Sequence, residues 1–173
     1  MKILAKNIGH FLVVLLALTL AGCTQEGVAV AAEKPAQTDS AIALHVYKSP
    51  TCGCCESWIE HVEDGGFSTS SHHPDNLDQL KLDKGIAPKY QSCHTAISNN
   101  GYVFEGHVPA KLIQQFLANP PRDAIGLAVP GMPIGSPGME MNDKFSSYQV
   151  LLIMADGSAK VFAEINAAKD QYN

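Results

Sequence analysis

The alternation of apolar and polar positions predicts strands followed by helices. In residues 41–48 (AIALHVYK), Ile42, Leu44 and Val46 fall on one side of an extended chain, as in a half-buried strand. In residues 54–66 (CCESWIEHVEDGG), apolar positions recur at helical spacing, and a pair of glycines supplies the stop. We therefore expect a strand and then a helix at the start of the folded region.

The rest of the chain continues this succession. Asn100-Gly101 is a strong hairpin signal, and Asp156-Gly157 marks a second hairpin. We expect strands at 67–73, 89–98 and 102–108, helices at 75–85 and 110–119, the latter beginning at Pro109, and a β-hairpin at 148–165. The order β-α-β-α-β-β-α predicts an α/β protein with a thioredoxin-like fold, in which helices flank a mixed sheet and a C-terminal β-hairpin closes the fold.

One segment follows neither period. Residues 122–147 are rich in Gly, Pro and Met, and a loop of this length is usually functional or disordered. It carries Met132, Met139 and Met141. A thioether is a soft ligand that suits Cu(I), whereas a methionine can equally staple an apolar loop. We keep Met132 and Met139 as weaker candidate ligands.

The first residues have the pattern of an export signal. Lys2 and Lys6 precede a short apolar run, which is too short to span a bilayer as a helix. The sequence LAGC ending at Cys23 resembles a bacterial lipobox, in which the cysteine is lipidated. We therefore predict a lipoprotein-type signal peptide at 1–22, a flexible tether at 23–40 and a folded domain at 41–166.

Export predicts the compartment and restricts the chemistry. The expected location is the periplasm, with the chain lipid-anchored to the outer or inner membrane; cleavage near Ala32 would instead give a soluble periplasmic protein. The formal net charge of −5, without any cluster of Lys and Arg, argues against nucleic acid as a partner. Outside the cytoplasm, thiols tend to end as disulfides or as metal ligands.

Four cysteines beyond the signal carry the candidate chemistry. Cys52 and Cys55 stand in CxxC spacing between a predicted strand and a predicted helix. A helix N-terminus stabilises a thiolate, so this pair can cycle between dithiol and disulfide and is the candidate catalytic pair. Cys54 and Cys93 are not needed for that cycle. Three thiolates within one turn, joined by Cys93, would surround soft metal ions.

Several alternatives stay open for these thiols. Two disulfides, Cys52–Cys55 and Cys54–Cys93, would also account for them. A zinc site normally uses two separated pairs, and an Fe–S cluster also needs four cysteines. A thiol-disulfide oxidoreductase acting on proteins would need only the CxxC pair.

Histidines offer weaker candidate ligands. His94 adjoins Cys93, and strand alternation would point it to the opposite face, so a structural role is as reasonable as ligation. His107 lies just before a predicted helix and can ligate metal or set the charge near the thiols. We expect His45 to be structural. His72, with its neighbour in sequence, is expected at the surface, where at most a weak adventitious metal site would form.

An ordered set of motifs matches a known family. CGCCESW, GIAP, SCHTA, GYVFEGHVP and GLAVPGMPIGSPGME together resemble the CopG family of exported bacterial copper-resistance proteins, long described as a domain of unknown function. The resemblance covers about residues 42 to 165. Many relatives have Gly-Val-Pro where this chain has Gly-Ile-Ala-Pro. The resemblance implies a thioredoxin-like domain, copper binding through Cys52, Cys54, Cys55 and Cys93, and a role in interconverting copper oxidation states.

Together these features predict a periplasmic copper-binding protein in copper resistance. It would hold Cu(I), as one or several ions, in the cysteine thiolate site, and the CxxC pair could interconvert Cu(I) and Cu(II). Copper ions are the expected partners, together with other periplasmic copper-resistance proteins or a redox partner. A passive copper buffer or chaperone would use the same ligands, so the sequence does not separate it from a copper oxidoreductase.

Overall fold

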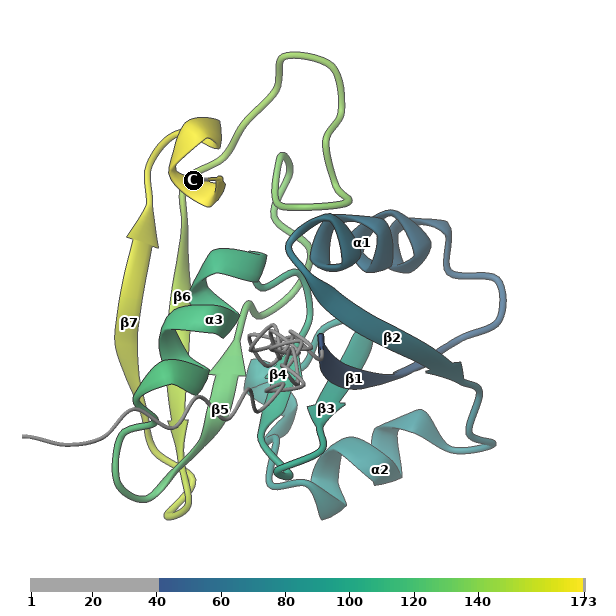
Figure 1. Ribbon diagram of the computed structural model, residues 1–173, viewed down its shortest axis with the longest axis vertical. Helices are drawn as coiled ribbons and strands as arrows, with labels where there is room; N and C mark the ends of the chain where they lie inside the picture. The colour runs from purple at the N-terminus through teal and green to yellow at the C-terminus, as the bar shows by residue number, and fades with distance from the viewer. Residues whose placement is uncertain (1–40, 173) are drawn as a thin grey trace, which may run out of the picture. The chain divides into compact units, whose positions relative to one another are not determined.

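The computed structural model describes residues 41–172, which form a mixed sheet with helices on both faces (Figure 1). The strand order is β2-β1-β3-β4-β5-β6-β7. The elements are β1 Ile42–Lys48, α1 Gly53–Asp64, β2 Phe67–His72, α2 Leu77–Asp83, η1 Pro88–Tyr90, β3 His94–Ser98, β4 Val103–Glu105, α3 Ala110–Ala118, β5 Ala124–Ala128, β6 Tyr148–Met154, β7 Ala159–Ile165 and η2 Ala168–Gln171, where η denotes a short 3₁₀ helix.

The first half of the sheet has the predicted thioredoxin-like arrangement. Strand β1 pairs in parallel with β2 and antiparallel with β3, and β3 pairs antiparallel with β4. Strands β5 to β7 extend the sheet beyond β4, and β6 and β7 form the predicted C-terminal hairpin. The fold class expected from the sequence is therefore confirmed.

The main core lies between the sheet and helices α1 and α3. Leu44 and Val46 of β1 are fully buried against Trp58 of α1, whose indole N–H donates to the Val108 carbonyl at 2.9 Å. Burying one aliphatic side chain such as Leu44 stabilises the folded state by about 1.5–3 kcal/mol. Ile42, which the alternation places on the same face, is the first residue of β1 and is 45% exposed.

Strand β5 is the clearest difference from the sequence prediction, which placed a loop across 122–147. The five residues of β5 pair in parallel with β4 and antiparallel with β6. Gly126 is required here, because a Cβ at this position would lie 1.7 Å from the Val103 carbonyl oxygen. Both faces of β5 are covered, since Leu127 belongs to the main core and Ala128 packs in a second cluster of buried side chains, so its sequence lacks the alternation that marks a strand.

The remaining loop, 129–147, is anchored to the end of the chain. The Gln171 side chain donates to the Gly135 carbonyl at 2.8 Å and accepts from the Tyr148 hydroxyl at 2.5 Å. Gln171 belongs to η2, which lies beyond residue 166. These bonds give a segment without regular structure a fixed path across the fold.

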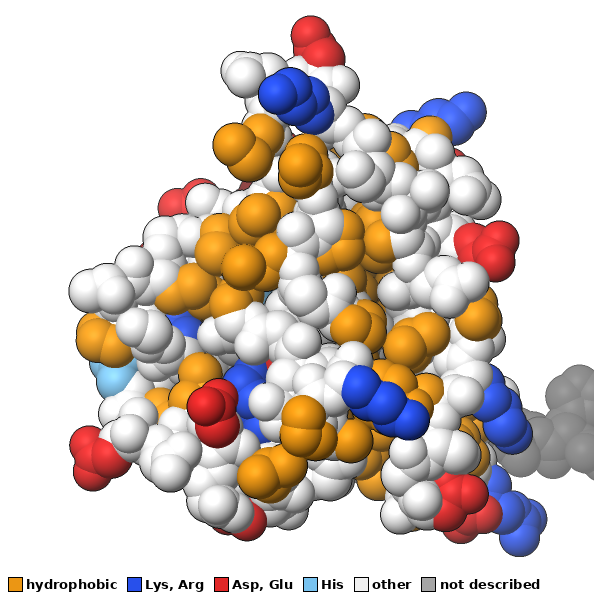
Figure 2. All heavy atoms as spheres, turned by 180° about the vertical axis from the view of Figure 1, so that it is seen from behind, with side chains coloured by type: hydrophobic (Ala, Val, Ile, Leu, Met, Phe, Trp, Pro, Cys, Tyr) orange, Lys and Arg blue, Asp and Glu red, His pale blue; other side chains and the backbone are white. Residues whose placement is uncertain are grey.

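Two boundaries also differ in detail from the prediction. The expected strand at 89–98 is divided into η1 and β3, so Cys93 precedes the strand. Pro109 is the N-cap of α3 rather than its first residue. The predicted signal peptide, tether and lipidated Cys23 lie outside the described residues. Between residues 41 and 172, no helix is long and apolar enough to cross a membrane. On the face shown in Figure 2, charged side chains are scattered among hydrophobic ones.

Candidate metal centre

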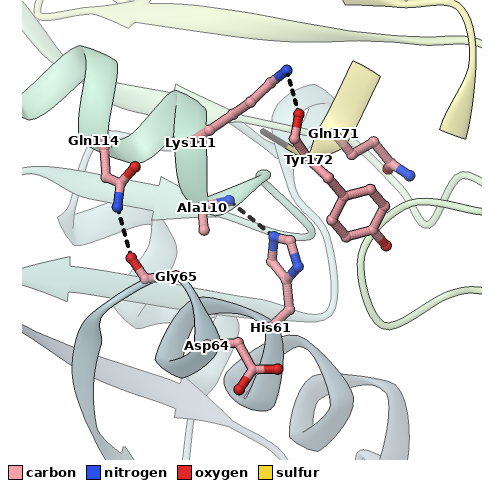
Figure 3. Close-up of a pocket in the computed structure, with 8 residues that line it drawn as sticks. All are labelled: His61, Asp64, Gly65, Ala110, Lys111, Gln114, Gln171 and Tyr172. Atoms are coloured by element: carbon pink, nitrogen blue, oxygen red, sulfur yellow. Dashed lines mark hydrogen bonds between the residues drawn. The ribbon is translucent and has the colours of Figure 1, made fainter. Parts of the chain in front are cut away.

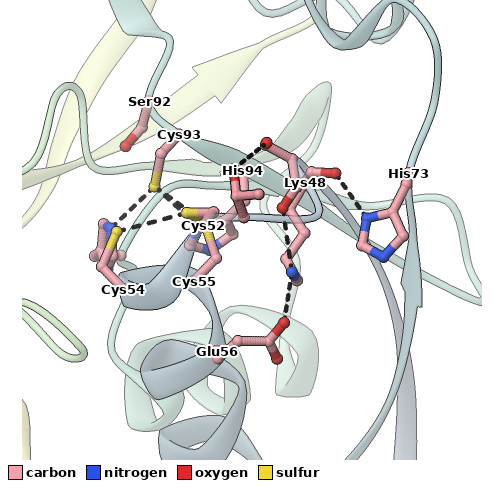
Figure 4. Close-up of a disulfide and its surroundings, with 12 residues drawn as sticks. Lys48, Cys52, Cys54, Cys55, Glu56, His73, Ser92, Cys93 and His94 are labelled. Atoms are coloured by element: carbon pink, nitrogen blue, oxygen red, sulfur yellow. Dashed lines mark hydrogen bonds and ion pairs between the residues drawn. A yellow bond between two sulfur atoms is a disulfide. The ribbon is translucent and has the colours of Figure 1, made fainter.

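The four sulfur atoms meet where the N-terminus of α1 faces the start of β3 (Figure 4). The chain turns after β1, where the Cys52 N–H donates to the Ser49 carbonyl at 3.2 Å. Cys52 is then the N-cap of α1, and Cys54 and Cys55 occupy its first turn. The sequence could place these three by local spacing alone, whereas only the sheet brings Cys93 to them.

The sulfur geometry combines a disulfide with two free thiols. Cys52 and Cys55 form a disulfide bond, while Cys54 and Cys93 are free. The Cys54 Sγ lies 3.6 Å from the Cys52 Sγ, and the Cys93 Sγ lies 3.5 Å from the Cys55 Sγ. All four sulfur atoms lie within 4.8 Å of one another. One of the two disulfides considered from the sequence is therefore present, and the second is not.

A buried ion pair positions the segment that carries Cys93. Lys81 of α2 and Glu105 of β4 are both buried and form a salt bridge. The Glu105 carboxylate accepts from the Ser92 N–H at 2.7 Å and from the Thr95 hydroxyl at 2.6 Å, and the Lys81 ammonium donates to the Ser92 carbonyl at 3.0 Å. The residue before Cys93 is thus held at both its N–H and its carbonyl. Nothing in the local sequence pattern indicated this pair, because it joins two elements that are distant in the chain.

Two buried histidines face the Cys93 thiol. The His107 Nδ1 lies 2.8 Å from the Pro137 carbonyl, which can only accept, so Nδ1 carries the proton and Nε2 offers a lone pair. That Nε2 lies 3.1 Å from the Cys93 Sγ, and the His94 Nδ1 lies 3.3 Å from the same sulfur. Cys93, His94 and His107 therefore form a second group with atoms close enough to share a metal ion.

The structure corrects the predicted orientation of His94. Strand alternation would place its side chain away from Cys93, but Cys93 precedes β3 and does not follow the pleat. The ring is fully buried beside Trp58, with ring centroids 4.3 Å apart. Its Nε2 has no hydrogen-bond partner within residues 41–172. A buried polar atom left without a partner is costly and calls for an explanation.

Burial keeps this group of side chains uncharged. Burial, followed by the neighbouring Cys54, raises the pKa of Cys93 to about 12. Burial lowers the pKa of His107, and burial together with the nearby His107 lowers the pKa of His94 well below its usual range. The Cys93 thiol is therefore protonated at neutral pH, and a metal ion bound there would have to displace its proton.

The glycine- and methionine-rich loop crosses the site through its backbone. A Cβ on Gly138 would lie 2.6 Å from the backbone nitrogen of Trp58 and 2.7 Å from the Cys54 carbonyl oxygen, so only glycine allows the loop to pack on α1 here. Met132 and Met141 are 53% and 54% exposed, and Met139 is half-buried. The loop thus contacts His107 through Pro137 and the backbone of α1 at Gly138, while two of its methionines face solvent.

A separate pocket of about 200 Å³ lies between α1, α3 and the end of the chain (Figure 3). His61 projects into it and its Nε2 accepts from the Ala110 N–H at 3.0 Å, which ties α1 to the start of α3. Lys111 closes another side by donating to the Tyr172 carbonyl at 3.1 Å. None of the four clustered cysteines lines this pocket, so it is not part of the candidate metal centre.

Comparison with known proteins identifies the family. Residues 90–139 match the family described as protein of unknown function, DUF411. Two solved structures of copper resistance protein CopG, forms 1 and 2, are 41% and 40% identical to this chain, each with a TM-score of 0.68. Each match covers 72% of this chain and 98% of the CopG chain. No curated protein matches. The chain belongs to the CopG family of copper resistance proteins.

Proposed function

We propose that the thiol cluster, meaning Cys52, Cys54, Cys55 and Cys93, binds Cu(I) as the working site of a periplasmic copper-resistance protein. The observation that carries this proposal is the convergence of four sulfur atoms from two distant segments within 4.8 Å of one another. Thiolates are soft ligands that select Cu(I). Each thiolate can bridge two ions, so the cluster accommodates more than one copper.

The Cys52–Cys55 disulfide gives the site a redox reaction. In the dithiol form, the two sulfurs supply two electrons as they join, and two Cu(II) ions become two Cu(I) ions with release of two protons. The reverse reaction breaks the disulfide, oxidises two Cu(I) to Cu(II) and takes up two protons. Both directions balance, so the pair supports interconversion of copper oxidation states.

The same bond sets the number of ligands. With the disulfide formed, Cys54 and Cys93 are the free thiols; with it reduced, all four sulfurs are available. A reduced site should therefore hold Cu(I) more tightly than an oxidised one. Tight binding of the product Cu(I) would then compete with disulfide formation, and this competition couples the redox state of the pair to copper loading.

Neighbouring groups support metal binding at Cys93. The lone pair of the His107 Nε2 and a nitrogen of His94 lie at the Cys93 sulfur, so either imidazole can complete the coordination of an ion held there. The Pro137 carbonyl fixes the tautomer of His107, as second-shell carbonyls do for metal-binding histidines. The methionines of loop 129–147 would act at the entrance to the site rather than at its centre.

Titration of single Cys-to-Ser variants with Cu(I) tests this proposal. Cys54→Ser should weaken Cu(I) binding, measured anaerobically in competition with a chromophoric Cu(I) chelator. Ser57→Ala, an exposed change on the same helix, is the matched control and should bind as the wild type does. Unchanged affinity in Cys54→Ser would refute its role as a ligand. Stopped-flow reduction of Cu(II) by the dithiol form separates a copper oxidoreductase from a passive buffer.

One observation favours a second candidate function, thiol-disulfide exchange with proteins. Cys52 is partly accessible while Cys55 is fully buried, which is the arrangement that lets one sulfur be attacked and shields the other. Reduction of insulin disulfides by the metal-free dithiol protein would support this function. It leaves the free thiols of Cys54 and Cys93 without a role.

The proposed location depends on the export signal and Cys23. We infer that the mature chain is attached to a periplasmic membrane face through a lipid on Cys23. Metabolic labelling with a radioactive fatty acid tests this, since Cys23→Ser should abolish incorporation. Failure of the wild-type chain to incorporate the label, with recovery in the soluble periplasmic fraction, would indicate ordinary cleavage instead.

A further inference from the structure

Two histidines meet on the face of the sheet opposite α1. On β1, Leu44 and Val46 face α1, so the alternating residue His45 points to the other face. In the parallel pairing with the edge strand β2, His45 lies opposite Ser70, and His72 is the next residue on the same face of β2. Both imidazoles are only partly buried, so ions from solvent can reach them.

The ring nitrogens point at one another. The His45 Nδ1 lies 3.2 Å from the His72 Nε2, and the Ser70 hydroxyl oxygen lies 2.9 Å from the first and 3.2 Å from the second. Imidazole nitrogens bind first-row metals at about 2.0–2.1 Å, so one ion bound to both would subtend an angle of about 100°. That angle lies between the values for square-planar and tetrahedral coordination, so the separation of the two nitrogens suits a shared ion.

Neighbouring side chains set the tautomer of the His45 ring and the orientation of the His72 ring. The His45 Nε2 lies 3.2 Å from the Asn99 Oδ1, an acceptor, so the proton sits on Nε2 and the Nδ1 lone pair faces His72. Tyr47 stacks on the His72 ring, with centroids 4.9 Å apart and planes 23° apart, and so restricts its rotation. One ring thus has a fixed tautomer and the other a fixed orientation.

We propose that His45 and His72 form a second metal site, which takes a divalent first-row transition ion and prefers Cu(II). Ser70 or water completes the coordination. Imidazole suits Cu(II), Ni(II) and Zn(II), and Cu(II) binds most tightly in this series, whereas soft thiolates select Cu(I). This imidazole pair shares no residue with the thiol cluster, and the proposal stands whether or not the cluster binds copper.

The test is a Cu(II) titration followed by electron paramagnetic resonance in a chain whose four clustered cysteines are replaced by serine. We expect one Cu(II) signal with coupling to two nitrogens. His45→Gln and His72→Gln should each weaken binding at least about tenfold, since even second-shell changes cost that much. Asn99→Ala should weaken it less, because Asn99 only orients a ligand.

His73→Gln is the matched control. His73 adjoins His72 in sequence, but its Nδ1 lies 3.0 Å from the Lys48 carbonyl, outside the imidazole pair (Figure 4). It should leave both affinity and spectrum unchanged. If the four-serine chain does not fold, the oxidised wild-type chain with Cys54 and Cys93 alkylated replaces it. Equal Cu(II) affinity in the His72→Gln and His73→Gln chains, or a signal without nitrogen coupling, would overturn the proposal.

Discussion

The thiol cluster and the imidazole pair hold metal-binding atoms in different ways. The thiol cluster lies against buried groups, and the Lys81–Glu105 ion pair and the backbone of loop 129–147 both support it. The imidazole pair lies on two neighbouring strands at an edge of the sheet, and strand register alone brings its rings together. The thiol site therefore depends on contacts from several parts of the fold, whereas the imidazole site at the sheet edge depends on one strand pair.

The largest expected effect comes from Glu105→Gln. It leaves Lys81 buried without its carboxylate, and breaking a buried pair in this way costs about 3–5 kcal/mol. Urea unfolding measures the loss. Glu164→Gln is the control: Glu164 is exposed and its carboxylate accepts only from the exposed Gln149 side chain, at 3.3 Å, so its loss should cost no more than about 0.5 kcal/mol. Equal costs for the two variants would contradict the view that the Lys81–Glu105 pair is structural.

The second effect separates the two sites directly. Cys93→Ser replaces a soft ligand by a hydroxyl, so Cu(I) affinity should fall more than about 100-fold, beyond the usual cost of a second-shell change. Competition with a Cu(I) chelator measures this loss. Cu(II) binding at His45 and His72 should not change in the same variant. A parallel loss of Cu(II) binding would show that the two sites are coupled.

The third effect tests the support that the loop gives to the thiol cluster. Gly138→Ala places a Cβ against α1 at a φ of 81° and should cost about 1–3 kcal/mol of stability and weaken Cu(I) binding. Gly131→Ala is the control, since Gly131 also has a positive φ, 68°, but a Cβ there meets no atom within 4 Å. Urea unfolding and Cu(I) competition compare the two. If the two variants lose equal stability and affinity, backbone strain and not contact with α1 is the cause.

The smallest effect, taken over one pH unit, is the pH dependence of Cu(I) binding. The pKa of Cys93 is raised to about 12 by burial and by Cys54, so this thiol holds its proton throughout the neutral range. The pKa values of His94 and His107 are lowered by burial, so their rings are already neutral there. Cu(I) affinity should therefore rise as pH rises from about 6 to 9, by about tenfold per unit for each thiol proton displaced. Chelator competition at several pH values measures the slope, and a flat profile would exclude proton displacement.

Much of the fold follows from the local pattern. The alternation in β1, the helical spacing after Cys54 and the Asp156-Gly157 turn lie where the sequence predicts them. Strand β5 was missed because burial on both faces removes the alternation. The predicted orientation of His94 is wrong because the alternation was extended to Cys93, one residue before β3 begins.

The sequence by itself determined the strand-helix order and the close spacing of Cys52, Cys54 and Cys55, because neighbouring residues on one turn need no other contact to meet. Tertiary structure decided everything that joins distant segments: Cys93 beside the other sulfurs, Lys81 beside Glu105, and His45 beside His72. These contacts depend on strand pairing and helix packing, in which burial of the core sets the register. The pattern of a single strand does not specify that register until the partner strand is known.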